Sequence, residues 1–334
     1  MRFVPGTTGG RPRRRRSVFA LVAVATVAAG CTKGASPVTS PSQPPRSVAT
    51  APPNVPNPFK VTARFDPSSL GLEHPIGLAI GPDGNLYVTD TSQAVAVISP
   101  DGKVLGQWGS PGTGAGELSF VSFSGDPSDI HAAIAVGSDG QVYVSDNGNY
   151  RIQVFSGSGA FTRQFGRKGK GEGEFQTPFD IAVDAAGSVY VADDQGESVS
   201  KFSPTGHFEW RIGGFQAKDP DLIGHEHLAL VDAHGRVVMV NDDIGRVLYV
   251  NSRGHKVDGF SAPGCNVTVD ALGYTFVNSC FSGQTQVFDR KHSFIGVWSG
   301  PDNTLSMAPV FGSNGRVFAL GQDGTILELE VTLP

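Results

Sequence analysis

The feature that most restricts the fold of this chain is a unit that recurs six times. An apolar triplet is followed by a turn ending in glycine and then by a β-rich run, as in the segment from Ile134 through Gly140 to Val144. The turn glycines stand at positions 84, 140, 187, 235, 273 and 315, and a bulky residue near the end of a unit stands at 108, 165, 212, 260 and 298. The spacings between successive glycines and between successive bulky residues vary together along the chain. Insertions and deletions therefore fall between units and leave each unit intact.

Repeats of about 40–50 residues with roughly four short strands each are typical of β-propellers. The composition agrees, because 44 Gly and 23 Pro supply many tight turns, while 17% charged residues is low for helical bundles. We therefore predict an all-β chain that forms a six-bladed β-propeller.

The six units have only five trailing strands, and the missing one is found at the N-terminal end. The segment VTARF (61–65) has the form of FTRQF (161–165). We predict that this N-terminal strand completes the last blade and removes the sheet edge that a terminal blade would otherwise expose.

The N-terminal segment has the pattern of an export signal. Arg11 and Arg13–Arg16 precede the apolar run Val18–Ala29, which is too short to span a membrane. The ending Ala28-Ala29-Gly30-Cys31 resembles a bacterial lipobox, which implies a diacylglycerol on Cys31 and a site at the outer face of the cytoplasmic membrane. A plain Sec signal with an incidental Cys is the alternative. Residues 15–19 (RRSVF) also resemble a twin-arginine signal, so the export route stays open.

Three parts follow from this pattern: a signal peptide (1–30), an anchor Cys with a Pro- and Ser-rich disordered tether (31–58), and the propeller (59–334). The signal holds six Arg and no acid, so its removal leaves 20 basic against 31 acidic residues, a formal net charge of −11. One small basic cluster remains, at Arg163, Arg167, Lys168 and Lys170. The acidic balance and the compartment argue against a nucleic-acid partner.

The segment Asp139–Phe155 (DGQVYVSDNGNYRIQVF) resembles the NHL repeat, as do the Gly-rich connectors 109–118 and 166–175. The resemblance covers residues 59–334 and weakens in the last two units. It implies a six-bladed propeller with the first strand of each unit around a central channel. It implies no single activity, because NHL-type propellers include lyases, a lactonase-like group, RNA-binding modules and sensor domains of receptor kinases.

The residue before each inner strand should ring one mouth of the channel. By register, three adjacent blades place Asp180, His227 and Asn266 there, with His225 and Glu226 beside them. These groups could hold a divalent cation, zinc or calcium, and the related lyase and lactonase propellers place their metal at this mouth. The alternative is a polar funnel that binds only water.

The second strands end in acids. In the repeat pattern such an Asp accepts backbone N–H bonds where the strand turns. The additional acids would make the same face negative and attractive to cations or basic ligands. The predicted acidic face comprises Asp90, Asp146, Asp193, Asp194, Asp242 and Asp243.

The thiols other than Cys31 are Cys265 and Cys280, which a hairpin turning at Asp270 to Gly273 brings close together. In an oxidising compartment this predicts a disulfide. The remaining histidines, His74 and His131 among them, are interpreted as surface residues, and no catalytic residue can be assigned.

Two functions are compatible with the sequence. The first is a membrane-anchored binding or scaffold propeller whose ligand is a protein or an envelope polymer. The second is a metal-dependent lyase or lactonase-like enzyme acting at the channel mouth.

Overall fold

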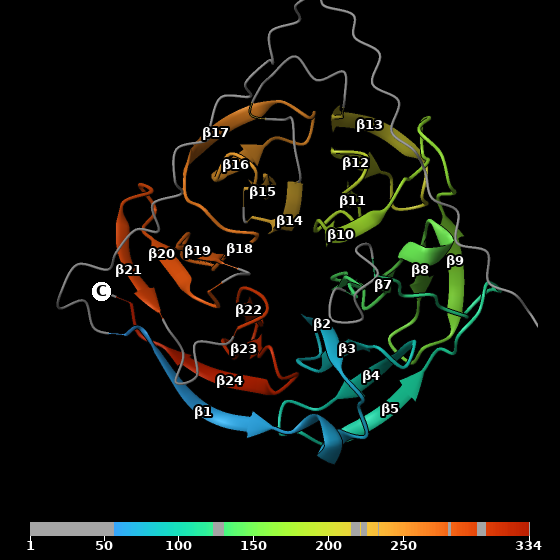
Figure 1. Ribbon diagram of the computed structural model, residues 1–334, viewed down its shortest axis with the longest axis horizontal. Helices are drawn as coiled ribbons and strands as arrows, with labels where there is room; N and C mark the ends of the chain where they lie inside the picture. Colours follow the sequence, from blue (N-terminus) through green and yellow to red (C-terminus); the bar gives the residue numbers. More distant parts are fainter. Residues whose placement is uncertain are drawn as a thin grey trace, which may run out of the picture. The chain divides into compact units, whose positions relative to one another are not determined.

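The structure is a computed structural model. It describes residues 57–122, 130–214, 221, 226–232, 234–279, 282–298 and 305–333, and for residues 226–231 only the backbone. These residues belong to one compact unit, Arg46–Pro334. They form six four-stranded antiparallel sheets around a common centre (Figure 1), which confirms the predicted six-bladed β-propeller. Within the described ranges, no helix is both long and apolar enough to cross a membrane.

Each of the first three blades uses consecutive strands, ordered from the centre outward. Blade 1 consists of β2 (Pro75–Ile80), β3 (Leu86–Asp90), β4 (Ala94–Ile98) and β5 (Val104–Trp108). Blade 2 consists of β6 (Ile134–Val136), β7 (Val142–Asp146), β8 (Arg151–Phe155) and β9 (Phe161–Phe165). Blade 3 consists of β10 (Pro178–Val183), β11 (Val189–Asp193), β12 (Ser198–Phe202) and β13 (Phe208–Gly213).

The remaining blades repeat this order. Blade 4 consists of β14 (Glu226–Val231), β15 (Val237–Asn241), β16 (Arg246–Val250) and β17 (Lys256–Ser261). Blade 5 consists of β18 (Asn266–Val269), β19 (Thr275–Asn278), β20 (Thr285–Phe288) and β21 (Phe294–Trp298). Blade 6 consists of β22 (Val310–Phe311), β23 (Val317–Leu320), β24 (Ile326–Val331) and β1 (Phe59–Phe65). Short 3₁₀ helices lie at η1 (Pro67–Leu70) and η3 (Asn147–Asn149).

Blade 6 confirms the predicted closure, because its outermost strand comes from the N-terminal end. β1 pairs antiparallel with β24, from Phe59 opposite Val331 to Phe65 opposite Ile326. The two ends of the ring are thus joined by backbone hydrogen bonds, so no terminal blade stands alone.

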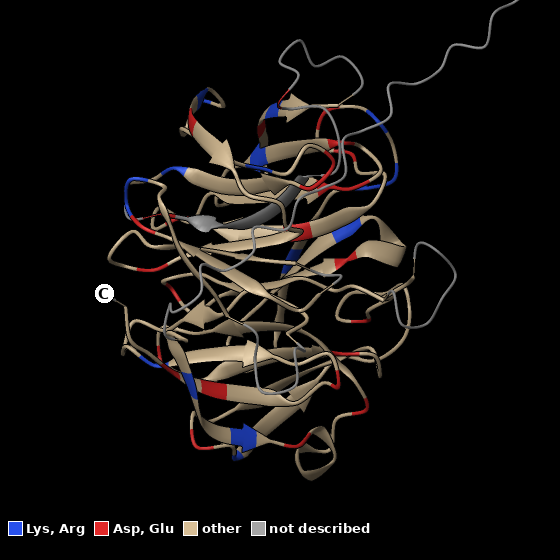
Figure 2. Cartoon of the chain, turned by 60° about the vertical axis from the view of Figure 1, so that its left-hand side comes forward, with Lys and Arg blue, Asp and Glu red and all other residues tan. Residues whose placement is uncertain are grey.

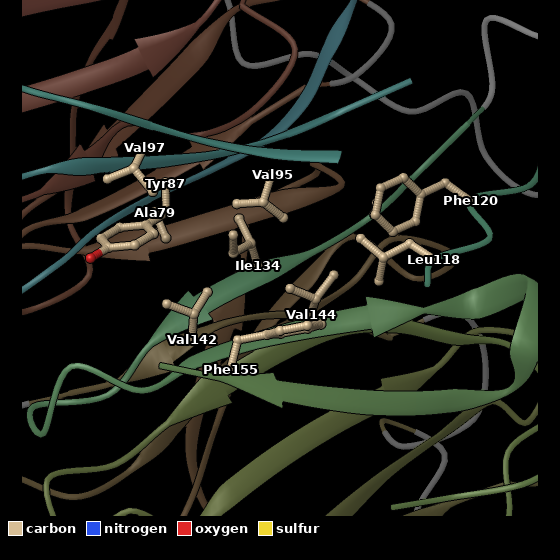
Figure 3. Close-up of a cluster of buried hydrophobic side chains, with 11 residues drawn as sticks. Ala79, Tyr87, Val95, Val97, Leu118, Phe120, Ile134, Val142, Val144 and Phe155 are labelled. Carbon is tan, nitrogen blue, oxygen red and sulfur yellow. The ribbon is translucent and has the colours of Figure 1, made fainter. Parts of the chain in front are cut away.

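The core lies between neighbouring blades. β3 and β4 are buried at every position, because both faces of a blade pack against other blades, whereas the outer strand β5 is mostly exposed. This explains why the second and third strands read as continuous apolar runs without strict alternation. Figure 3 shows one such cluster, in which Tyr87 and Val95 of blade 1 meet Val144 and Phe155 of blade 2.

The bulky residue at the end of each unit packs against the next blade. The ring of Trp108 lies 4.3 Å from that of Phe155, and Phe165 lies 4.7 Å from Phe202. A Cβ at Gly159, whose φ is +88°, would overlap the indole of Trp108, so glycine is required there for both conformation and space. Phe65 packs in the same way on the cluster that contains Leu86 and Ile98 of blade 1, which makes it the sixth marker.

Candidate functional site at the channel mouth

The innermost strands surround the centre of the ring (Figure 1). A cavity of about 660 Å³ lies between them. The inner strands β2, β6, β10, β18 and β22 all contribute to its wall, which is mainly apolar and includes Ile134, Ile181 and Val267. Its polar lining comes largely from residues at or just before the start of these strands. The cavity is therefore an apolar funnel with a polar mouth, a common composition for ligand sites.

Hydrogen bonds between blades fix the geometry of this mouth. The hydroxyl of Thr89 on β3 donates to the carbonyl of Ala132 in blade 2 (2.6 Å), and that of Ser145 on β7 donates to Pro178 in blade 3 (2.8 Å). A Cβ at Gly77 would overlap both the Ala132 carbonyl oxygen and the Thr89 hydroxyl. Adjacent blades thus approach so closely at the mouth that the rim positions are rigidly spaced.

Asp180 and Asn266, both predicted as mouth residues, line the cavity. The amide oxygen of Asn266 accepts a hydrogen bond from the backbone N–H of Ala308 in blade 6 (3.2 Å). Glu226 and His227 lie on β14, opposite Asn241 and Val240 in the backbone register, and their side chains lie outside the described residues. His225 lies wholly outside them.

Among the described residues there is no group of three or more His, Cys, Asp and Glu side chains that could hold a metal ion. Asp180 and Asn266 could contribute two oxygen ligands, and the other members of the predicted set are those whose side chains are not described. A divalent cation at the mouth therefore stays a prediction.

The structure adds two histidines that the sequence reasoning placed on the surface. His74 and His131 line the cavity, and the imidazole of His131 packs on the ring of Phe179 at 4.7 Å between centroids. His131 precedes the mouth residue Ala133 by two positions, the same offset by which His225 precedes His227. That shared offset is the signal that could have identified it.

The prediction of an acidic face requires correction. Asp90, Asp146 and Asp193 are between 0% and 2% exposed, so they present no charge to solvent. Asp90 accepts from the backbone N–H of His74 (2.8 Å), and Asp193 accepts from that of Gln176 (2.9 Å). Each carboxylate instead ties the end of the second strand to the loop that enters the inner strand of its own blade, which agrees with the structural reading of the motif.

Asp146 also carries a buried ion pair. Its carboxylate accepts from the guanidinium of Arg151 (2.6 Å) and from the backbone N–H of Ser119 (2.7 Å).

Burial raises the pKa of Asp193, and hydrogen bonds from the backbone of Gln176 and Thr177 partly offset this increase.

In blade 4 the repeat position was assigned one residue too late. Asp90, Asp146 and Asp193 are the last residues of β3, β7 and β11, but β15 ends at Asn241, not at Asp242. Asn241 is fully buried. The remaining acids of the predicted face, Asp194, Asp242 and Asp243, are half-buried, so no continuous acidic surface results. Figure 2 shows acidic and basic residues interspersed along the ring.

Cys265 is buried, and its backbone N–H donates to Asn278 (2.9 Å), so the hairpin that brings 265 next to 278 is present. Cys280 lies outside the described residues, and the Cys265–Cys280 disulfide stays a prediction. Cys31 and the regions 1–30 and 31–56 likewise lie outside them.

The fold and the funnel define a six-bladed β-propeller with a ligand-sized central cavity. Comparison with known proteins supports the fold: a family described as "6-bladed beta-propeller" matches residues 129–212. No curated protein matches the chain in sequence.

Similar solved structures share the ring at low sequence identity. A streptogramin B lyase structure is 14% identical with a TM-score of 0.57, covering 82% of this chain and 98% of that chain. A catalytically inactive virginiamycin B lyase from Staphylococcus aureus, determined with quinupristin, is 12% identical with a TM-score of 0.56, covering 83% and 100%. The WD40 β-propeller domain of Doa1 is 13% identical with a TM-score of 0.54, covering 82% and 97%. At these identities the likeness concerns the fold alone.

Proposed function

We propose that this protein is an exported binding propeller, held at the outer face of a bacterial cytoplasmic membrane through a lipid on Cys31. Its repeats are of the NHL type, on the basis of the segment 139–155. Its ligand is a protein or an envelope polymer that docks over the channel mouth. The observation that carries the binding function is the cavity of about 660 Å³ with apolar walls and a polar rim.

The chemistry of the mouth supports a ligand that inserts an apolar group. The volume lies within the range of about 300–1,000 Å³ typical of ligand pockets. Burial of an apolar group of the ligand against the apolar wall would stabilise the complex. At the rim, the carboxylate of Asp180, the amide of Asn266 and the imidazole of His131 would orient polar parts of the ligand.

Site-specific photocrosslinking in cells that make the full chain tests this proposal. A benzophenone amino acid at Phe179, on the rim, should give an adduct of defined mass. Leu272 is the control: it is 63% exposed and lies in the turn between β18 and β19, at the opposite end of β18 from the mouth. Ala133→Trp, which fills the mouth, should remove the adduct. No adduct from position 179, or equal adducts from both positions, would contradict the proposal.

A metal-dependent lyase or lactonase is the second candidate. It is favoured by an imidazole and a carboxylate, His131 and Asp180, at one rim, in a fold shared with structures described as lyases. Elemental analysis of the purified protein separates the two functions. A stoichiometric Zn²⁺ or Ca²⁺ that is lost in both Asp180→Ala and His227→Ala would favour the enzyme. A protein that retains neither ion after incubation with it would exclude this candidate.

A further inference from the structure

A second cavity, of about 370 Å³, lies between blades 2 and 3 and is separate from the channel. It is lined by the connector 166–175, by the turn after β7 and by the loops before β6 and β10. These loops join strand ends on the same face of the ring as the channel mouth. Its described lining includes Lys168 and Lys170 and no Asp or Glu, so this part of the wall is basic in a protein of negative net charge.

The chain contains an internal reference for the loop that carries the lysines. The connector 109–118, between blades 1 and 2, has the same backbone as 166–175. In the first, Gly112 N–H donates to Leu118 (3.0 Å), and in the second, Gly169 N–H donates to Phe175 (3.0 Å). Each loop is also closed by a glutamate that accepts a backbone N–H at 2.8 Å. The two connectors therefore share the same backbone hydrogen-bonding pattern.

The two lysines are among the residues that differ between the two copies. At the positions of Lys168 and Lys170, the first connector has Pro111 and Thr113. Because the backbone is the same in both copies, the fold of the loop requires neither lysine. Within the described part of the chain, Lys168 makes no ion pair. The nearby Glu174 pairs with Arg167 (2.7 Å) and so does not neutralise the pocket.

Tyr150 likewise differs from Gln93, the residue at the same position of blade 1. It adopts the left-handed conformation (φ +58°) in the residue before β8, as Gln93 does before β4 (φ +65°). The side chain of Gln93 is bonded into its own blade and connector, through Nε2 to Thr91 (3.1 Å) and Phe120 (3.3 Å). The Tyr150 ring instead lies in the pocket wall with the ammonium of Lys168 4.6 Å from its centroid and 3.2 Å from its hydroxyl.

Two amides complete the pocket. Gln176 donates through Nε2 to the carbonyl of Gln195 (2.8 Å). Among the described residues, the side-chain amide of Gln195 makes no hydrogen bond. Asp193 is 2% exposed and does not line the pocket, and its carboxylate accepts from the backbone N–H groups of residues 176 and 177.

We propose that this pocket binds an acidic sugar residue of an oligosaccharide. Lys168 and Lys170 would hold the carboxylate, because charge-assisted hydrogen bonds are the stronger ones. The ring of Tyr150 would pack on the apolar C–H face of the sugar, and the amides of Gln176 and Gln195 would bond its hydroxyls. The proposal concerns a different cavity from the channel mouth and does not depend on the function proposed there.

Isothermal titration calorimetry of the full chain in detergent, with hexagalacturonate as the probe, tests the proposal. The acid should bind, its methyl ester should not, and affinity should fall with added NaCl. In the double variant Lys168→Gln, Lys170→Thr the affinity should fall about tenfold or more. Tyr150→Gln, which restores the residue of blade 1, should weaken binding while the melting temperature stays unchanged.

The matched control is Lys103→Gln, which removes the same charge from an exposed turn between β4 and β5, at the opposite end of its blade. It should bind as the wild type does. Equal binding of acid and ester, or wild-type affinity in the double variant, would overturn the proposal. Complete competition by an equal concentration of inorganic phosphate would identify a simple anion site and overturn the sugar assignment.

Discussion

The closure of the ring by β1 makes a quantitative prediction for Phe59→Ala. Phe59 is 5% exposed and, although it belongs to blade 6, it packs on two aromatic rings of blade 5. The ring centroids lie 4.8 Å away for Trp298 and 5.7 Å for Phe276. Loss of a buried phenyl group costs about 3–5 kcal/mol. In a domain of this size each kcal/mol shifts the melting temperature by about 2 °C, so we expect a fall of about 6–10 °C.

Lys60→Ala is the control on the same strand. Its ammonium pairs with Glu330 (2.9 Å), but both side chains are more than half exposed, so the pair adds little. Its melting temperature should change by less than about 2 °C. Differential scanning calorimetry measures both variants. A Phe59→Ala protein that melts like Lys60→Ala would refute the reasoning. So would a separate early transition for blade 6, since closure should couple that blade to the ring.

Three further predictions concern other parts of the chain. Burial raises the pKa of Asp193 above its usual 3.8. The wild type should therefore lose stability relative to Asp193→Asn as the pH rises through that value, and urea unfolding at pH 3 and pH 7 measures this. A difference in unfolding free energy between the two proteins that is the same at both pH values would contradict the prediction. A disulfide between Cys265 and Cys280 closes a loop of about 15 residues and should contribute about 3 kcal/mol, so reduction should lower the unfolding midpoint; a free-thiol count of two would exclude it. Cys31→Ser should abolish palmitate labelling, and retained label would place the lipid elsewhere.

The fold could be predicted because its determinants are local and repeated. The turn glycines and the terminal bulky residues recur in every unit, and Phe65 carried the marker that located the missing strand. In the structure these bulky residues bridge consecutive blades, as Trp108 does to Phe155. A residue that must meet the next blade is constrained in every repeat, so the pattern is visible in one sequence.

The burial of the acids could not be predicted in this way. Asp193 is covered by the loop at Gln176 and Thr177, which enters its blade from the preceding connector. Periodicity gives the position of a residue in its strand but not which loop closes over it. His131 was missed for a related reason: it lines the channel with its imidazole packed on Phe179 of the neighbouring blade, and periodicity does not give contacts between blades.

The repeats also separate residues that the fold needs from residues that it does not. At the mouth, blades 1, 2 and 6 have small residues, Gly77, Ala133 and Ala308, while blades 3 and 5 have Asp180 and Asn266. Because small residues suffice in three copies of the mouth, the repeat itself does not require a polar residue there, although Asn266 also accepts a hydrogen bond from the backbone of Ala308. A ligand of the channel should therefore lie off the axis, toward the side of the rim between blades 3 and 5. This asymmetry is what a symmetric ring needs in order to bind a single orientation of its ligand.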